Sequence, residues 1–165
     1  MNSIWKLFPL IVSNFSFSEI VSSENPFKSK IAVKEGKLKG SCSKSFSGES
    51  RTNFLKIYSS FKTDKKREKL ENYLSGQDKN IQVSNIKTSD LNNREIKLTV
   101  DYDIDIDNKV STFDNEMYID LEYNNDFKNL ELKDRKTDYQ FDYKENFEST
   151  TVFVIPEGYK VSKIP

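Results

Sequence analysis

Cys42 is the one cysteine of the chain and its first candidate for nucleophilic chemistry. A catalytic thiol is usually activated by a histidine that takes up its proton, and the 165 residues contain no histidine. Cys42 also stands in the alternating run of residues 37–46, which is typical of a β-strand. A small buried side chain is therefore the better interpretation of Cys42. We predict that this chain holds no catalytic residue and is not an enzyme.

A run of alternating aspartates is the second candidate, in this case for cation binding. Asp103, Asp105 and Asp107 have the spacing of the first three ligands of an EF-hand calcium loop, but Asn108 stands where that loop needs glycine. Isoleucines alternate with the aspartates, so we expect them on the polar face of a strand. Carboxylates on one face would recruit Ca²⁺ only weakly. The three aspartates are thus a weak calcium candidate, and no cofactor is predicted.

Composition and motifs exclude several other classes of function. Lysine plus arginine and aspartate plus glutamate each total 26, so the formal net charge is zero. A nucleic-acid-binding domain would usually carry a basic excess, and we therefore predict no nucleic-acid partner. The chain contains no phosphate-binding glycine loop, no dinucleotide-binding motif and no zinc-ligand spacing. A single cysteine also rules out an intrachain disulfide.

Strands must position most of these residues. Residues 30–34 and 37–46 flank Glu35-Gly36, a sequence that predicts a hairpin with a two-residue turn. Strict alternation over residues 96–106 predicts a half-buried antiparallel strand. Further alternating apolar residues indicate strands near residues 117–123, 130–132, 139–143, 151–155 and 159–164.

The pattern becomes helical between the hairpin and the later strands. Apolar side chains follow helical spacing at Phe54, Leu55, Tyr58 and Phe61, and again at Leu70, Tyr73 and Leu74. Thr63 is predicted to cap the second helix at its N-terminus, and Gly76 is predicted to end it. One-faced strands need a second layer to bury their apolar side. We therefore predict a mainly β fold, an antiparallel β-sandwich with one or two flanking helices at about residues 50–75.

The chain divides into an N-terminal segment and one domain. Residues 1–27 are predicted to be a linker or a packed strand segment, and residues 28–165 the β-sandwich domain. The apolar run at residues 7–12 is interrupted by Pro9 and lacks a small-residue cleavage site, so it does not match a signal peptide. It is also too short for a transmembrane helix, and we predict no membrane insertion.

Two segments of the sequence resemble a known family. The first is E-G-K-L-K-G-S at residues 35–41, followed by S-F-S-G at residues 45–48 and by Arg51. The second is residues 135–161, which close on F-V-I-P-E-G-Y-K-V. Together they resemble the β-rich domain of unknown function that follows the transglutaminase-like core of large bacterial envelope proteins. The resemblance covers residues 28–165 and is most specific at the closing stretch.

The resemblance implies a non-catalytic accessory domain. Such a domain would pack on, or present substrate to, a transglutaminase-like core in the same polypeptide, and no catalytic residue of that core is carried onto this chain. It would lie in the cell envelope of a Gram-negative bacterium, in the periplasm or exposed at the surface. Domains of this kind continue with further strands, so the chain is expected to be truncated at Pro165. The strand edge left open would favour a homodimer of the isolated fragment.

Two alternatives remain open at this point. One is a protein- or glycan-binding β-sandwich module of the cell envelope, which predicts an exposed aromatic or concave patch. The other is a structural assembly domain that uses its sheet edges for strand addition.

Overall fold

The computed structural model describes residues 5–7, 23–123 and 145–163. Its strands are β1 (Trp5–Leu7), β2 (Ser23–Lys34), β3 (Lys37–Phe46), β4 (Ile81–Thr88), β5 (Leu98–Ile106), β6 (Val110–Phe113), β7 (Glu116–Ile119), β8 (Glu145–Val154) and β9 (Val161–Lys163). Its helical elements are α1 (Gly48–Ser60), the short 3₁₀ turn η1 (Thr63–Lys65) and α2 (Lys66–Leu74). The prediction of a mainly β fold with flanking helices is confirmed.

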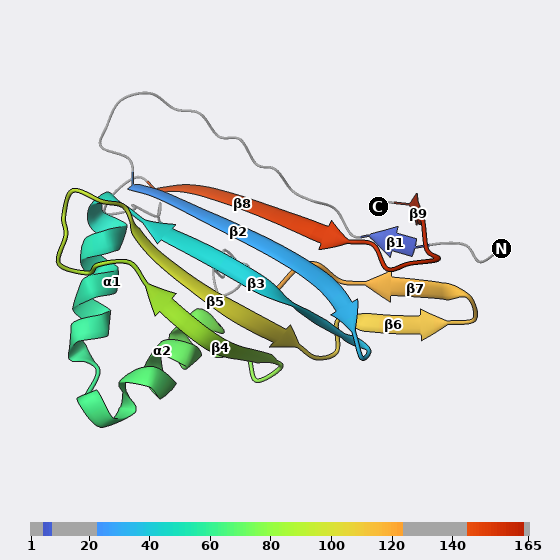
Figure 1. Ribbon diagram of the computed structural model, residues 1–165, viewed down its shortest axis with the longest axis horizontal. Coiled ribbons are helices and arrows are strands. Elements are labelled where there is room, and N and C mark those ends of the chain that lie inside the picture. Colours follow the sequence, from blue (N-terminus) through green and yellow to red (C-terminus); the bar gives the residue numbers. More distant parts are fainter. Residues whose placement is uncertain (1–4, 8–22, 124–144, 164–165) are drawn as a thin grey trace, which may run out of the picture.

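The larger of two sheets has five strands in the order β4-β5-β3-β2-β8 (Figure 1). Its centre is the predicted hairpin, in which β2 and β3 pair as far as Lys34 and Lys37. Glu35 and Gly36, between them, have φ angles of 54° and 74°. A type I′ turn requires positive φ at both central residues, and its twist matches that of the flanking strands. The hairpin prediction is confirmed.

One edge of this sheet is formed by β8, which runs parallel to β2 from Ser23↔Glu145 to Ala32↔Val154. The sheet is therefore mixed, whereas we predicted antiparallel pairing. Alternation shows which face a side chain takes and says nothing of the direction of the neighbouring strand. The difference thus arises from a long-range pairing that the pattern does not encode.

The start of β2 lies inside the segment assigned to the N-terminal linker or strand. Residues 23–27 belong to this strand, so the boundary placed between residues 27 and 28 falls within it. Pro26 is tolerated there because pairing with β3 begins only at Phe27, so the missing N–H interrupts no bond on that side.

One face of the larger sheet forms the hydrophobic core. Alternate β5 side chains are at most 5% exposed, namely Leu98, Val100, Tyr102, Ile104 and Ile106. The same face takes Phe27 and Ile31 from β2, and Leu38, Cys42 and Phe46 from β3. Ile96, predicted to begin the β5 alternation, precedes the strand and is 43% exposed.

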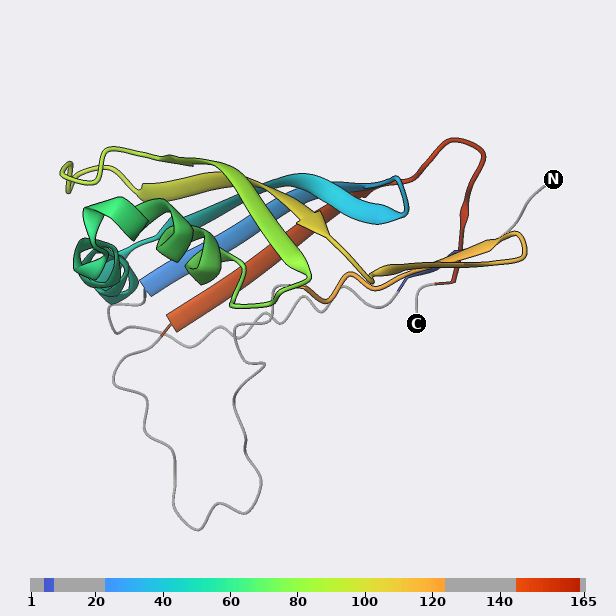
Figure 2. The same cartoon turned by 90° about the horizontal axis from the view of Figure 1, so that it is seen from below.

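Both helices lie on this core face, at one end of the sheet (Figure 2). Phe54 of α1 is buried and stacks on Phe46 with 4.6 Å between ring centroids. Tyr73 of α2 meets Phe54 edge-on at 5.8 Å. Offset-stacked and edge-on rings are the favoured arrangements, so this aromatic cluster holds both helices against β3.

The ends of α2 only partly match the prediction. Its N-cap residue is Lys65, which makes no side-chain capping hydrogen bond. Thr63 begins η1 instead, so its predicted capping role is wrong; the extra 3₁₀ turn moves the helix start past it. Gly76 follows the C-cap Ser75 with φ of 61°, as expected for a glycine that ends a helix.

The smaller sheet has the order β6-β7-β1-β9 and lies at the end of the larger sheet away from the helices (Figures 1 and 2). Met117 and Ile119 of β7 are buried. After β7 the chain returns to the core face, where the Tyr123 hydroxyl donates a hydrogen bond to Ser29 and the Tyr123 ring meets Phe27 edge-on at 6.3 Å. Tyr123 therefore fastens this segment to the larger sheet.

Some predicted strands cannot be compared with the structure. Those near residues 130–132 and 139–143 lie outside the described residues, as does Ile164. Most of the strand predicted at residues 151–155 belongs to β8, and β9 takes up part of the one predicted at residues 159–164.

Gly40 provides a test of the hairpin register. A Cβ atom at this position would lie 2.1 Å from the Lys30 carbonyl oxygen and 2.8 Å from the Ile31 Cα. We expect Gly40→Ala to lower the free energy of unfolding by about 2 kcal/mol, because the two strands must move apart to admit the methyl group. Urea unfolding measures this, with Ser41→Ala, at an exposed neighbouring position, as the matched control. Equal stability of both variants and the wild type would contradict the close approach.

Candidate functional site

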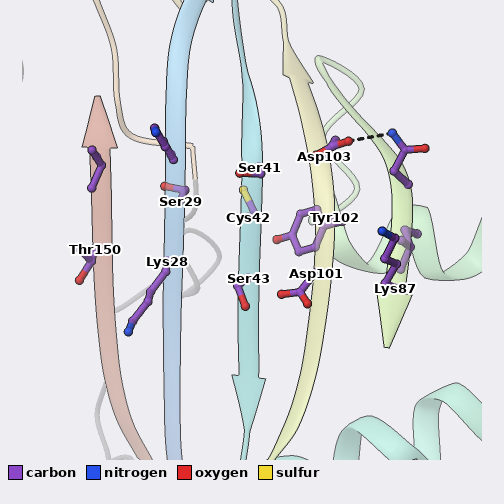
Figure 3. Close-up of a pocket in the computed structure, with 14 residues that line it drawn as sticks. Lys28, Ser29, Ser41, Cys42, Ser43, Lys87, Asp101, Tyr102, Asp103 and Thr150 are labelled. Atoms are coloured by element: carbon purple, nitrogen blue, oxygen red, sulfur yellow. Dashed lines mark hydrogen bonds between the residues drawn. The ribbon is translucent and has the colours of Figure 1, made fainter. Parts of the chain in front are cut away.

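The side of the larger sheet opposite the core is polar, and we call it the open face. The strand register places Thr150, Lys28, Ser43, Asp101 and Lys87 in one row across all five strands (Figure 3). The next row is Val152, Lys30, Ser41, Asp103 and Ser84. Both helices lie on the other side of the sheet (Figure 2). Within the described ranges, these two rows are therefore accessible.

A hollow of about 760 Å³ lies over these two rows. Its shape follows from side-chain length. On the open face, the central strand β3 contributes the short side chains of Ser41 and Ser43, while longer lysines flank them on β2 and aspartates on β5. The volume falls within the range of ordinary ligand pockets, but the hollow is open and most of the residues that line it are charged or polar.

Charge is divided across the hollow. Lys28 and Lys30 stand on one side of β3, Asp101 and Asp103 stand on the other, and Lys87 of β4 lies beyond Asp101. Asp103 accepts a hydrogen bond of 2.8 Å from the Asn85 side chain, drawn as a dashed line in Figure 3. Among the described residues, no ion pair engages Lys28, Lys30 or Asp101.

Nearer the hairpin turn, the lysines of the open face form ion pairs with carboxylates of the same chain. Lys37 pairs with Asp107 at 2.8 Å, and Lys39 pairs with Asp105 at 3.1 Å and with Glu35 at 2.6 Å. The hydrogen bond to Asp107 raises the pKa of Lys37. The pKa of Lys39 is also raised, mainly by its hydrogen bond to Glu35 and then by its hydrogen bond to Asp105. Such solvent-accessible pairs contribute little to stability. The hollow thus holds the part of the open face whose charges remain available to a partner.

The predicted calcium residues are on the open face but do not form a calcium loop. Asp103 and Asp105 project from β5, Asp107 follows directly after it, and each contacts a different neighbour along the sheet. Among the residues that the structure describes, no three acidic, cysteine or histidine side chains gather where they could hold a metal ion. This geometry matches the solvated strand face that alternation predicted.

Cys42 lies on the core side of β3, as predicted for a structural residue. It is 4% exposed, and burial, with a smaller contribution from the Asp103 charge, raises the pKa of its thiol to about 12. The thiolate is the reactive form of cysteine, so a thiol with this pKa is a poor nucleophile near neutral pH. Its position agrees with a packing role.

Sequence reasoning did not identify the lysine side of the hollow. Lys28 and Lys30 alternate in β2 as the aspartates alternate in β5, so the same period-two signal was present. The missing information was that β3, with its serines, brings the two strands onto either side of one hollow.

Comparisons of the chain with protein-family models, curated proteins and solved structures give no significant match. The resemblance to the domain that follows a transglutaminase-like core therefore stays a prediction. In the part of the chain that the structure describes, no helix has the length and apolar character needed to cross a membrane.

Cys42 gives a pH-dependent test of its burial. An ordinary thiol ionises near pH 9.0, whereas this one does so near 12, so between these values the unfolded chain binds fewer protons than the folded chain. Stability must therefore fall as the pH rises through this window. Between pH 8 and pH 10 we expect wild type to lose about 1 kcal/mol more than Cys42→Ala in urea unfolding. Parallel losses in the two proteins would show that the thiol ionises equally in both states.

Proposed function

We propose that this chain is a non-catalytic accessory domain that docks a second protein domain on the open face of its five-stranded sheet. The observation that carries the proposal is the hollow in which Lys28 and Lys30 oppose Asp101 with no ion pair among the described residues to neutralise them. Complementary charge on a partner orients docking and excludes wrong partners more than it adds affinity.

The division of charge defines the chemistry of the partner surface. It should place carboxylates over Lys28 and Lys30, and a cationic side chain over Asp101. The serines of β3 add hydroxyl groups at the centre, and Thr150 adds one at the edge strand β8; these groups can donate or accept hydrogen bonds. The exposed Val152 offers a small apolar contact at the margin.

A protein partner fits the hollow better than a glycan. Flat sugar faces are usually held by exposed aromatic rings, whose face is apolar. The one aromatic residue in the lining is Tyr102, and it is 5% exposed with its side chain on the core side of β5. Most of the residues that line the hollow carry a charged or hydroxyl group instead.

The identity of the partner rests on the sequence resemblance. We propose a transglutaminase-like core in the same polypeptide, within the cell envelope of a Gram-negative bacterium. The buried Cys42 and the lack of histidine in the chain support a division of labour in which any acyl-transfer chemistry belongs to that core.

Site-specific photocrosslinking in the producing cells tests the proposal. With a photoreactive residue in place of Ser41 in the open face, we expect a covalent adduct in which this position is crosslinked to peptides of a transglutaminase-like core in the same polypeptide, identified by mass spectrometry. The same residue in place of Lys69, exposed on α2, should give no such adduct. The double variant Lys28→Glu/Lys30→Glu should abolish the adduct, while the matched double variant Lys62→Glu/Lys69→Glu should not.

Three results would overturn the proposal. The first is that Ser41 and Lys69 give the same adducts, and the second is that the Ser41 position gives none. The third concerns catalysis: transamidation by the purified chain that persists in Cys42→Ala would show that the domain itself is an enzyme.

The edge strand β8 favours a second candidate, assembly through strand addition to a second copy. Residues 149–155 carry no charge, and Val154 and Ile155 are 41% and 44% exposed. The opposite edge is protected: β4 has an irregularity between Ser84 and Lys87, with a positive φ of 50° at Asn85. Bulges and lysines discourage edge-to-edge pairing, and within the described residues β8 has neither between 149 and 154.

Sedimentation of the purified chain tests this candidate. We expect a concentration-dependent dimer that Val154→Lys shifts to monomer, because a charge on the edge opposes antiparallel pairing of two β8 strands. Gln82→Lys, on the opposite edge strand β4, is the matched control and should leave the dimer intact. A monomer at every concentration, or equal dissociation by both variants, would rule out pairing through β8.

A further inference from the structure

A second hollow, of about 950 Å³, lies away from the open face. One wall is a face of α1, a second is the first residue of α2, and the third is the loop between β4 and β5. Residues 51, 52, 55, 56, 58 and 59 of α1 take part, as expected for one helix face with three- and four-residue spacing.

The charge of this hollow has one sign. Its lining includes Arg51, Lys56, Lys66 and Arg94 and no carboxylate. The chain as a whole carries equal numbers of acidic and basic residues, so this is a local excess. Nearby acidic side chains, those of Glu49, Asp90 and Glu95, do not belong to the lining.

Arg51 holds the loop between β4 and β5 in place, and its positive charge is not neutralised in doing so. Its guanidinium donates hydrogen bonds to the carbonyl oxygens of Ile96 and Asn93, each at 2.6 Å, and to that of Leu91 at 3.4 Å. These acceptors are neutral, so the positive charge is not cancelled by a carboxylate. The three bonds hold the loop against α1 and fix the third wall of the hollow.

Lys66 is held in place by an aromatic ring. Its ammonium lies 4.0 Å from the centre of the Tyr58 ring, which itself stacks on the buried Phe54 at 5.9 Å. A cation over a ring face is attracted by the ring's quadrupole, so Tyr58 orders this lysine at the edge of the hollow. Because Lys66 is already ordered, it loses less side-chain entropy when it binds an anion.

The N-terminus of α1 points to the same ligand chemistry on independent grounds. Gly48, the first residue of this 13-residue helix, lines the hollow, and the N-cap residue Ser47 makes no side-chain capping hydrogen bond to the helix. First-turn N–H groups and the helix dipole favour negative charge, and phosphate groups in particular.

We propose that this hollow is a binding site for a small ligand with two or more linked phosphate groups. The spread of four cations around one opening suits a multivalent oxyanion better than a single compact one. The site is separate from the open face and does not depend on the docking function proposed for it.

Isothermal titration of the full chain with inorganic pyrophosphate at low salt tests the site. We expect saturable binding of one pyrophosphate per chain, tighter than binding of orthophosphate and weakened by added sodium chloride. The double variant Lys56→Gln/Arg94→Gln should bind about tenfold more weakly, because each substitution removes a charge-assisted contact. Both side chains are exposed, and an unchanged urea midpoint would show that the fold is intact.

The matched control is Lys62→Gln/Lys69→Gln, which removes the same charge from exposed positions outside the lining. It should bind pyrophosphate as the wild type does. An equal loss in both double variants would mean attraction to overall charge and would overturn the site. A wild-type chain that shows no saturable binding at millimolar pyrophosphate would overturn it as well.

Discussion

The pairing of β3 with β5 is the constraint on which the rest of the structure depends. In this register Leu38 faces Ile106 and Phe46 faces Leu98 on the core side. The same register sets Ser43 against Asp101 on the open face. A slip of one residue would exchange the two faces of a strand, placing aspartates in the core and isoleucines in solvent. Burial of the apolar side therefore also fixes where the charges of the open face lie.

The hairpin restricts this register further. The turn at Glu35-Gly36 has two residues with positive φ, which admits one pairing of β2 with β3. Gly40 then lets the β2 backbone approach so closely that no other residue type fits without movement of the strands. Two glycines thus restrain the sheet locally, while the hydrophobic face restrains it over its whole length.

Whether a feature of the fold could be predicted from the sequence depended on how far apart in the chain the interacting residues lie. The β5 alternation, the β2–β3 turn and the helical spacing around Phe54 are local, and each gave the correct element. The parallel pairing of β8 with β2 joins residues more than a hundred positions apart, and no local pattern encodes it. Thr63 failed as a cap because the chain forms the 3₁₀ turn η1 before α2, so Lys65 and not Thr63 precedes the helix.

The same distinction applies to the two hollows. Alternation predicted the polar face that carries Asp103, but the lysine side became visible only once the strand order placed β3 between β2 and β5. The cationic hollow depends on a loop that no periodicity describes, and Arg51 holds that loop through backbone carbonyls. Carbonyl acceptors carry no sequence signature, so this role of an arginine cannot be read from residue types.

Arg51 also links the two surfaces through the chain itself. The carbonyl of Ile96 that it binds lies just before β5, the strand that presents Asp101 to the open face. At the other end of this loop, the Ser89 N–H donates to the Thr99 carbonyl at 2.9 Å, and the Ser89 side chain accepts from the Thr99 N–H at 3.0 Å. The loop is therefore tied to α1 on one side and to the first residues of β5 on the other. Loss of the Arg51 guanidinium would remove a cation from the hollow and at the same time release a support of β5, so its charge and its architectural role cannot be separated by substitution. Lys56 and Arg94 contribute charge from exposed positions without such a role in the described hydrogen bonds, and this is why the chemistry of the hollow must be tested through them.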